Sequence, residues 1–419
     1  MKILWLVNIL LPAQCHKLGI PASQVGGWIE GLQKTLHDAE TEITVCSLAP
    51  QTTDVLFFEG EDGQYAIVPD NKDKLQDFFS LVLHRVQPDV LHVFGTEMYH
   101  TLEMMKVCDP LKTLLQIQGL TTAIAQNYFL GVPHKYQKKK RLPKNLPGRI
   151  MYNEHRYFLE MGKREREALG MARHVAGHTT WDKAHTQQLA PRAEYHCFPE
   201  TLRDVFYNSR QWEYETCQKH SIFLSQASYP IKGAHMLLRI MPDIVREYPN
   251  AHLYIAGPVP MYRAGIQKGW PMGAFYNYYG YLCDEIKQGG LKEYVSFVGL
   301  MNAETMRDRY LKSNVFVCPS SMENESNALS EAKILGVPSI ASYVGGVTDR
   351  IVHGEDGFFY PFSEPEILLY YIKQIFEDQQ LAKRLSASAF QNTHKLLNRQ
   401  GTLKKVIDIY QKIALGREK

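Results

Sequence analysis

The sequence predicts an α/β protein in which two doubly wound parallel sheets occupy two separate domains. Short apolar stretches alternate with helical ones along most of the chain, which is the pattern of parallel sheets covered by helices on both faces. With 419 residues the chain is too long for one hydrophobic core, and it suggests two domains of roughly 200 residues each. A hydrophobic content of 45% and a charged content of 22% agree with an ordinary globular protein.

The first half contains apolar stretches with the length of buried strands. The predicted strands cover residues 3–7, 43–47, 90–94 and 114–117, and helices are predicted at 27–37 and 72–86. The opening stretch has one lysine and no small-residue cleavage site, so a buried strand is favoured over a signal peptide. No apolar run approaches the roughly 20 residues that a membrane-spanning helix needs.

The second half repeats the alternation after a polar and aromatic stretch, residues 203–219, which is the predicted linker. Strands are predicted at 222–225, 252–256, 295–298 and 315–318, and helices at 234–247, 303–311 and 401–415. Residues 258–290 are rich in Gly, Tyr and Met and are interpreted as an insertion. The domains are therefore predicted at 1–205 and 215–399.

The net charge and the cysteines indicate which partners and which cellular compartment to expect. A net charge of +3 is nearly neutral for this length and gives no argument for nucleic acid as a partner. The seven cysteines are scattered, odd in number and without a Cys-x-x-Cys pair, which indicates a reducing compartment and argues against a structural zinc site. No Asp-x-Asp motif occurs, so no metal is predicted at the functional site. Together these features predict a cytoplasmic protein.

The most informative motif is a pair of glutamates, Glu323 and Glu331, at a predicted strand-to-helix turn. An apolar strand at 315–318 precedes the turn, and Ser326 or Asn327 is the predicted N-cap of the helix. The unpaired N–H groups and the positive dipole end of a helix start attract phosphate. Carboxylates beside such a phosphate cradle suit the hydroxyls of a sugar nucleotide. For an isolated pair at this spacing, two solvated surface glutamates are the alternative interpretation.

The residues around this pair resemble the donor site of the family-4 retaining glycosyltransferases, which have the GT-B fold. The family signature runs Pro-Ser, Glu, seven residues, Glu-Ala, Gly-x-Pro, Gly-Gly and Gly-Phe. The matching positions are Pro319, Ser320, Glu323, Glu331, Ala332, Gly336, Pro338, Gly345, Gly346, Gly357 and Phe358. The resemblance implies two Rossmann-like domains that face a central cleft, with the acceptor on the first domain and the donor on the second. It also implies that a C-terminal helix, about 400–419, packs back on the first domain.

The resemblance assigns roles to the donor-site residues. Glu331 is expected to bind the ribose diol and Glu323 the hydroxyls of the donor sugar. Lys232 is expected to neutralise the diphosphate as it leaves, although a surface lysine at a helix start is the alternative. The other expected donor-binding positions are Gly26 and Gly27, which alone would more often mark a turn, Gly299 near the base edge, and the backbone of Asn327, Ala328 and Leu329 at the phosphate.

The implied reaction retains the anomeric configuration and uses no cofactor beyond the nucleotide-sugar co-substrate. The departing diphosphate oxygen acts as the base, so catalysis depends on positioning and on cations around the leaving group.

Several positions depart from the family pattern. The arginine that usually precedes the lysine of the Lys-Gly pair is absent before Lys232. Glu325 adds a negative charge near the phosphate path, and Asp349 stands where the family has a longer acid. Gln118 replaces a histidine near the donor sugar and does not titrate near neutral pH. These changes leave the base and the sugar of the donor undetermined, although a UDP-sugar is favoured.

The acceptor is expected on the first domain. Glu97 follows a predicted strand at 90–94, at the edge where such sheets bind ligands, and is a candidate for an acceptor hydroxyl together with Gln118. A helix-start glutamate is the equal alternative for Glu97. The basic stretch 134–149 is either a solvated loop or a contact with an anionic membrane surface that presents a lipid-linked acceptor. RNA is not expected because no stacking signature accompanies the charges.

The leading hypothesis is a retaining hexosyltransferase that transfers a sugar from a nucleotide sugar to a saccharide or lipid-linked saccharide in surface-glycan synthesis. It would work in the cytoplasm, with the inner face of the plasma membrane as a place of peripheral contact. A related GT-B phosphorylase or sugar-nucleotide isomerase is a second possibility. The third is a catalytically weak sugar-nucleotide-binding or scaffold protein with the same fold.

Overall fold

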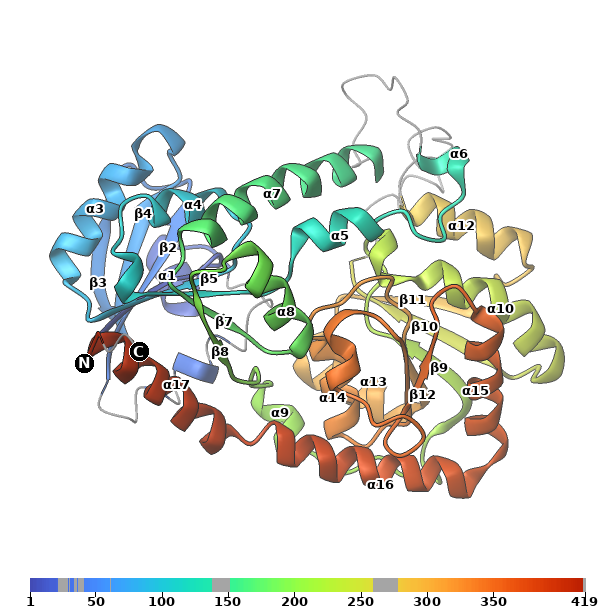
Figure 1. The fold of residues 1–419 in the computed structure, drawn as a ribbon. Helices are drawn as coiled ribbons and strands as arrows, with labels where there is room; N and C mark the ends of the chain where they lie inside the picture. The colour runs from blue at the N-terminus through green and yellow to red at the C-terminus, as the bar shows by residue number, and fades with distance from the viewer. Residues whose placement is uncertain are drawn as a thin grey trace. The chain divides into compact units, whose positions relative to one another are not determined.

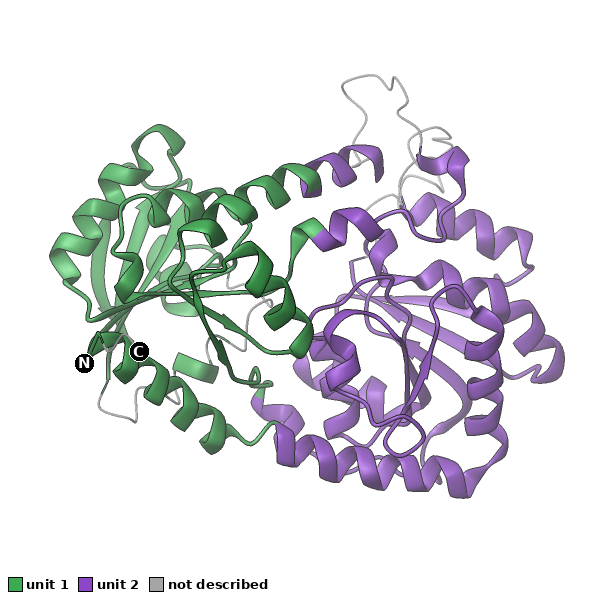
Figure 2. Cartoon of the chain, in the orientation of Figure 1, with its two compact units in different colours: residues 1–122, 159–203, 397–419 green, residues 123–158, 204–396 purple. Residues whose placement is uncertain are grey.

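The computed structural model describes residues 1–21, 41–60, 62–137, 151–258 and 278–416, and positions 29, 31–33 and 36 between the first two ranges. These residues divide into two compact units (Figure 2). The first unit contains residues 1–122, 159–203 and 397–419, and the second contains 123–158 and 204–396. The sequence-based division at 205 and 215 differs from this one mainly because residues 123–158 make their contacts within the second unit.

An eight-stranded sheet forms the centre of the first unit (Figure 1). Its order is β3-β4-β2-β1-β5-β6-β7-β8, and every neighbouring pair is parallel except β3 with β4. The strands are β1 (Lys2–Leu6), β2 (Glu42–Ala49), β3 (Leu56–Gly60), β4 (Gly63–Pro69), β5 (Val90–Phe94), β6 (Thr113–Gln116), β7 (His174–Gly177) and β8 (Glu194–Cys197). The four strands expected from the sequence correspond to β1, β2, β5 and β6.

The helices of the first unit are short. They are α1 (Pro12–Leu18), η1 (Lys72–Lys74), α3 (Leu75–Val86), α4 (Tyr99–Met105), η2 (Pro110–Lys112), α8 (Thr180–Leu189) and α17 (Arg399–Ala414). Two further helices, α5 (Thr121–Asn127) and α7 (Met151–Met171), each contain residues of both units. The helix expected at 27–37 falls mostly outside the described residues, and its described positions are helical.

Helix α17 completes the core of the first unit. Its apolar side, with Val406 and Ile413, is buried in the same hydrophobic cluster as the central strands β1 and β5. Trp5 Nε1 of β1 donates a 3.0 Å hydrogen bond to the hydroxyl oxygen of Tyr410, which lies 2.6 Å from His92 Nδ1 of β5. The last helix of the described chain is therefore part of the first unit.

A six-stranded parallel sheet forms the centre of the second unit, in the order β11-β10-β9-β12-β13-β14 (Figure 1). Its strands are β9 (Gln218–Leu224), β10 (His252–Ala256), β11 (Val295–Gly299), β12 (Ser313–Cys318), β13 (Ser339–Ser342) and β14 (Phe358–Tyr360). The chain builds outward from β9 to β11, then returns to the other side of β9 with β12. The reversal places a topological switch point at the carboxyl ends of β9 and β12, where open α/β sheets bind ligands.

The helices of the second unit follow its strands. They are α6 (His134–Gln137), α9 (Asp204–Tyr207), η3 (Pro230–Lys232), α10 (Ala234–Glu247), α12 (Tyr278–Gln288), α13 (Ala303–Lys312), α14 (Asn327–Ile334), η5 (Gly345–Asp349), α15 (Pro365–Glu377) and α16 (Gln379–Leu396). The predicted linker, 203–219, contains α9 and the start of β9. The described end of the predicted insertion forms α12. Within the described ranges, none of the helices combines the length and the apolar character needed to cross a membrane.

Candidate active site

The switch point of the second sheet carries a lysine and a glutamate that bind each other. Lys232 follows β9, and Glu323 follows β12. The Lys232 ammonium donates to both Glu323 carboxylate oxygens at 3.0 Å, and Ser320 Oγ donates to the same carboxylate at 2.8 Å. The side chains of the two ions are only 18% and 12% exposed. Burial opposes the ammonium, but the charge of Glu323 outweighs it and raises the pKa of Lys232, so the lysine stays cationic.

Two glycines allow the loops around this ion pair to pack closely. Gly233 has a φ of +68°, and a Cβ on it would lie 1.7 Å from the carbonyl oxygen of Pro319. Gly345 has a φ of +52°, and its Cβ would lie 2.0 Å from the carbonyl oxygen of Glu323. The next residue, Gly346, donates its N–H to that same Glu323 oxygen at 3.1 Å. The loops after β9, β12 and β13 therefore interlock only with glycine at these positions.

The second glutamate of the motif, Glu331, lies on α14 and is buried, with 8% of its surface exposed. The hydroxyl of Tyr310 on α13 lies 3.4 Å from Glu331 Oε2 and donates to the carbonyl oxygen of Ala328 at 2.9 Å. Tyr310 was not found from the sequence because it lies on a different helix, and its place in the chain gives no sign of this contact.

The structure shows which residue is the N-cap of helix α14. Ser326 is the N-cap, because its Oγ accepts the N–H of Leu329 at 3.4 Å, and Asn327 is the first helical residue. Asn327 and Ala328 line the cavity described below, whereas the N–H of Leu329 is already engaged by the cap. Of the three backbone positions predicted at the phosphate, the first two thus face the site.

Glu325, which the sequence placed near the phosphate path, is paired with Arg350. Its Oε1 accepts from the Arg350 guanidinium at 2.6 Å, and the two side chains are 2% and 5% exposed. The extra negative charge is therefore compensated inside the protein. Asp349, the shorter acid after Gly345-Gly346, lies at the end of η5 and is exposed.

A cavity of about 240 Å³ opens over the switch point. It is lined by the ends of the two central strands, by the Lys232–Glu323 pair and by the start of α14. Gln226, which follows β9, lines it too, and no arginine among the described residues does. Gly299, expected near a base edge, ends β11 with a φ of +83° and is not among the lining residues. The structure thus groups Lys232, Glu323 and the helix start around the cavity, whereas neither Gly299 nor Glu331 is among its lining residues.

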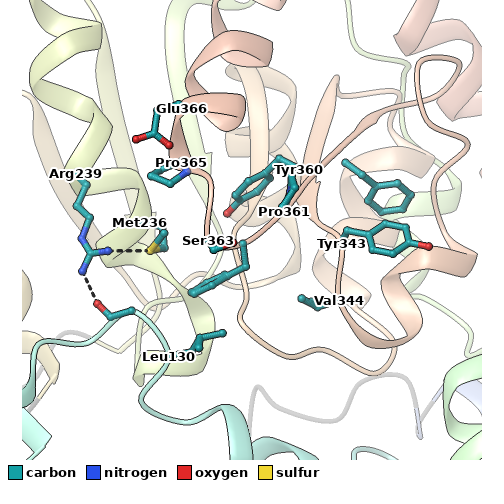
Figure 3. A pocket seen from close by; sticks show the side chains of 13 residues that line it. Leu130, Met236, Arg239, Tyr343, Val344, Tyr360, Pro361, Ser363, Pro365 and Glu366 are labelled. Atoms are coloured by element: carbon teal, nitrogen blue, oxygen red, sulfur yellow. Dashed lines mark hydrogen bonds between the residues drawn. The ribbon is translucent and has the colours of Figure 1, made fainter.

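A second, larger cavity of about 870 Å³ lies beside this site in the second unit (Figure 3). Val344 lines it, and the loop that continues from Val344 bonds to Glu323 through Gly346. The Arg239 guanidinium at its edge donates to the carbonyl oxygen of Gly131 and lies 3.5 Å from the sulfur of Met236. The lining is mostly apolar or aromatic: Leu130, Gly131, Met236, Arg239, Tyr343, Val344, Phe359, Tyr360, Pro361, Phe362, Ser363, Pro365 and Glu366.

The acceptor-side candidates of the first unit lie near one another at the carboxyl edge of its sheet. Gln118 Oε1 accepts from Asn8 Nδ2 at 3.1 Å. A Cβ on Gly95 would lie 3.3 Å from both Gln118 Oε1 and Glu97 Oε2. Glu97 is 8% exposed, and its Oε2 has no hydrogen-bond partner among the described residues. Burial raises the pKa of Glu97 to about 7. Gly26 and Gly27, predicted at the phosphates, lie outside the described residues.

Comparison with solved structures identifies the fold. Sucrose-phosphate synthase from Thermosynechococcus elongatus matches with a TM-score of 0.72 over 100% of both chains, at 15% sequence identity. HepE from Anabaena, solved in complex with UDP-glucose, matches with a TM-score of 0.65 over 98% of this chain and 100% of that chain, at 13% identity. The two doubly wound sheets therefore have the GT-B fold, which confirms the predicted fold class.

Residues 209–392 match the family described as Glycosyl transferases group 1. An uncharacterized glycosyltransferase of Methanocaldococcus jannaschii is 26% identical over 198 residues, which is 47% of this chain and 46% of that protein. A D-inositol 3-phosphate glycosyltransferase of Nocardioides is 22% identical over 189 residues, 44% of this chain and 39% of that protein. The chain spans less than half the length of these curated relatives. The matched part contains the whole Glu323-to-Glu331 motif, which confirms the resemblance.

Proposed function

We propose that this protein is a retaining glycosyltransferase that uses a nucleotide sugar, most simply a UDP-sugar, as its donor. The observation that carries the proposal is the buried Lys232–Glu323 ion pair at the switch point, inside a cavity that also contains the start of α14. The match of residues 209–392 to the family of glycosyl transferases supports the reaction class. The donor base is supported by relatives of the same fold, because HepE was solved with UDP-glucose and Staphylococcus aureus TarM with UDP.

In this proposal the ion pair is exchanged when the donor binds. The diphosphate takes the Lys232 ammonium, and Glu323 turns its carboxylate to the hydroxyls of the sugar. The backbone of Asn327 and Ala328 supports the phosphate, and Glu331 accepts from the ribose diol, with Tyr310 holding its carboxylate. Gly26, Gly27, Leu329 and Gly299 remain the further donor positions of the proposal, and Glu97 and Gln118 its acceptor-side positions.

The reaction then needs no separate protein base. The bond from the anomeric carbon to the diphosphate oxygen breaks, and the acceptor oxygen bonds to that carbon on the same face. The acceptor proton passes to the departing diphosphate. Lys232 stabilises the negative charge that develops there, which is the term that most often dominates such catalysis. No metal ion is required by this scheme, so transfer is expected to persist in EDTA.

Thermal unfolding with UDP, GDP and ADP tests the donor site directly. A nucleotide at about 100 times its dissociation constant stabilises the protein by roughly 2.7 kcal/mol and raises the melting temperature by several degrees. We expect one nucleotide to do so, the shift to collapse in Glu331→Ala, and the exposed Glu304→Ala, outside the cavity, to keep it. If no nucleotide stabilises the wild-type protein, the transferase proposal fails.

Transfer itself separates an enzyme from a binding protein of the same fold. Lys232→Ala is expected to abolish release of UDP from a bound UDP-sugar, while Lys287→Ala, on α12, leaves it unchanged. A wild-type protein that binds the donor but releases no nucleotide with any acceptor would favour the alternative, a catalytically weak sugar-nucleotide-binding or scaffold protein.

The larger cavity supports an acceptor with an apolar portion, such as a lipid-linked saccharide of surface-glycan synthesis. The buried Tyr360 hydroxyl has no hydrogen-bond partner among the described residues, and in Figure 3 it lies on the side of the ring toward Met236 and Arg239. An apolar chain with one polar group fits such a lining. Octyl and free glucosides, compared as acceptors, test this. The octyl form should be preferred, and Leu130→Glu should remove the preference, whereas Leu396→Glu, similarly exposed but outside the cavity, should not.

Peripheral contact with an anionic membrane through residues 134–149 belongs to the same proposal. Residues 134–137 form α6, and the rest of the stretch lies outside the described residues. Sedimentation with phosphatidylglycerol vesicles, compared with phosphatidylcholine vesicles, tests it, and equal sedimentation with both would contradict it.

A further inference from the structure

Three potential metal ligands lie together on one face of the first sheet, at its β8 edge. His174 of β7 is the register partner of Glu194 of β8, so their side chains lie on the same face. His196 is two residues after Glu194 on β8 and returns to that face. One ligand atom from each of the three residues lies within 4.8 Å of the other two. Among the described residues this is the group that brings two imidazoles and a carboxylate to one point.

The two imidazoles already have the separation of ligands that share an ion. His174 Nδ1 lies 3.1 Å from His196 Nε2. Two nitrogens bound tetrahedrally to zinc at about 2.0–2.1 Å stand roughly 3.3 Å apart, so a small adjustment would suffice. The two facing nitrogens cannot both carry a proton at this distance, so at least one has its lone pair directed at the shared space.

The third potential ligand, Glu194, forms an ion pair with a lysine. The Lys412 ammonium of α17 forms an ion pair with Glu194, and both side chains are partly exposed, at 35% and 46%. A long, partly exposed lysine side chain can withdraw to solvent when a divalent cation takes its place, because such surface pairs are weak. His196 is buried, at 7% exposed, His174 is half-buried and Glu194 is exposed, so the group is open to solvent at Glu194.

We propose that His174, His196 and Glu194 bind one divalent transition-metal ion, with Zn²⁺ as the ion that best fits two imidazoles, a carboxylate and one water. On binding, the imidazole whose N–H lies between the two facing nitrogens changes tautomer, so that both nitrogens offer lone pairs while both rings stay neutral, and the Lys412 ammonium gives up Glu194. The ion then joins β7 to β8 at the sheet edge. This site belongs to the first unit and takes no part in the proposed transfer reaction.

Calorimetric titration of the untagged, EDTA-treated and desalted full chain with ZnCl₂ tests the proposal. We expect saturable binding of one Zn²⁺ per chain. His174→Asn and His196→Asn should each weaken binding by at least about tenfold, the loss that even an outer partner of a ligand causes. Lys412→Met should tighten it, because the competing cation is gone. CoCl₂ should give the visible absorption of a four-coordinate site.

Matched variants exclude the other sources of zinc affinity. His84→Asn, at an exposed histidine of α3, and Cys197→Ser, next to His196 but on the opposite face, should both bind as the wild type does. The proposal is overturned if no saturable binding occurs, if one Zn²⁺ still binds to the His174→Asn/His196→Asn double variant, or if Cys197→Ser alone abolishes binding. Thermal unfolding of each metal-free variant checks that it is folded.

Discussion

At the scale of single residues, the candidate site contains a largely buried lysine whose charge is neutralised by a neighbouring glutamate. Lys232 and Glu323 each satisfy the other while no donor is bound. Removing one partner of a buried pair leaves an uncompensated charge, which typically costs more than the pair is worth. In the proposed donor complex this cost would be avoided, because the diphosphate would supply a new anion to Lys232 and sugar hydroxyls would replace the ammonium at Glu323.

Glu97 provides a pH test at the same scale. Its pKa is about 7 in the folded protein against 4.5 ordinarily, because burial disfavours the carboxylate. The folded first unit therefore holds a proton that the unfolded chain releases. The stabilisation is complete below pH 4.5 and is lost as the pH rises to about 7, by about 3 kcal/mol in all. Glu97→Gln should remove this loss. Its stability relative to the wild-type protein should therefore be greater at pH 8 than at pH 4.

Amide hydrogen exchange of β1 and β5 at several pH values measures this effect in the first unit alone. Glu103→Gln on α4 is the matched control with the opposite sign. Burial opposes its charge, but hydrogen bonds from Lys106 and Gln76 lower the pKa of Glu103. If the stability difference between wild type and Glu97→Gln does not change with pH, the pKa of Glu97 is the same in the folded and unfolded chain and the assignment is wrong.

At the scale of elements, the loops of the second sheet depend on backbone conformations that only glycine adopts without strain. Gly233 joins η3 to α10, and its missing side chain is what lets Lys232 approach the loop after β12. The same holds for Gly345 and the carbonyl oxygen of Glu323. The Lys-Gly and Gly-Gly pairs of the motif thus have a steric explanation that is independent of any ligand.

Gly233→Ala is therefore expected to destabilise the second unit by about 3 kcal/mol, from left-handed strain and from the clash with Pro319 together. Gly354→Ala is the control. Gly354 has a φ of +79°, but a Cβ on it would meet nothing within 4 Å, so only the strain of about 1 kcal/mol applies. Urea unfolding followed by amide exchange in β9 and β12 compares them. Equal losses in the two variants would show that the loops can separate without cost.

The sequence predicted the strands in the middle of both sheets, and in the first sheet it missed the outer strands β3, β4, β7 and β8 for a physical reason. Strands β1, β5, β9 and β12 are buried on both faces and appear as continuous apolar runs. Strands β7 and β8 have four residues each, and β8 is the sequence Glu-Tyr-His-Cys, which has no apolar signal. Helix α7 is long but strongly charged, so its periodicity was not recognised.

The candidate site was predictable to the extent that it lies in one stretch of chain. Glu323, Glu331 and the helix start are close in sequence, and Lys232 was reached through the family pattern. Tyr310, Arg350 and Gln226 were not identified as members of the site, because only the packing of separate loops brings them there. The same limit applies to His174 and His196, whose meeting depends on the register of β7 and β8.

At the scale of the whole molecule, the first unit is assembled from three separated chain segments. The last of them contains α17. The hydroxyl of Tyr410 on this helix forms hydrogen bonds with Trp5 of β1 and His92 of β5 inside the core. Tyr410→Phe should cost the first unit about 1–3 kcal/mol, because it leaves buried polar groups without a partner. Tyr370→Phe, on exposed surface of α15, should cost nothing measurable.

Differential scanning calorimetry with amide exchange in both sheets measures the effect of Tyr410→Phe. Protection should fall in β1 and β5 and stay unchanged in β9 and β12. A uniform loss across both sheets would show that the two units unfold as one.

The three-segment construction of the first unit also sets the order in which a newly made chain can acquire its structure. Residues 1–122 and 159–203 leave the ribosome early, but the helix that completes their core, α17, is not translated until the whole of 204–396 has been made. At about 5–20 residues per second, the wait lasts roughly 10–40 s. During that interval the second unit, which contains no residue of α17, can finish folding first, while the early sheet still exposes the apolar surface that α17 will cover.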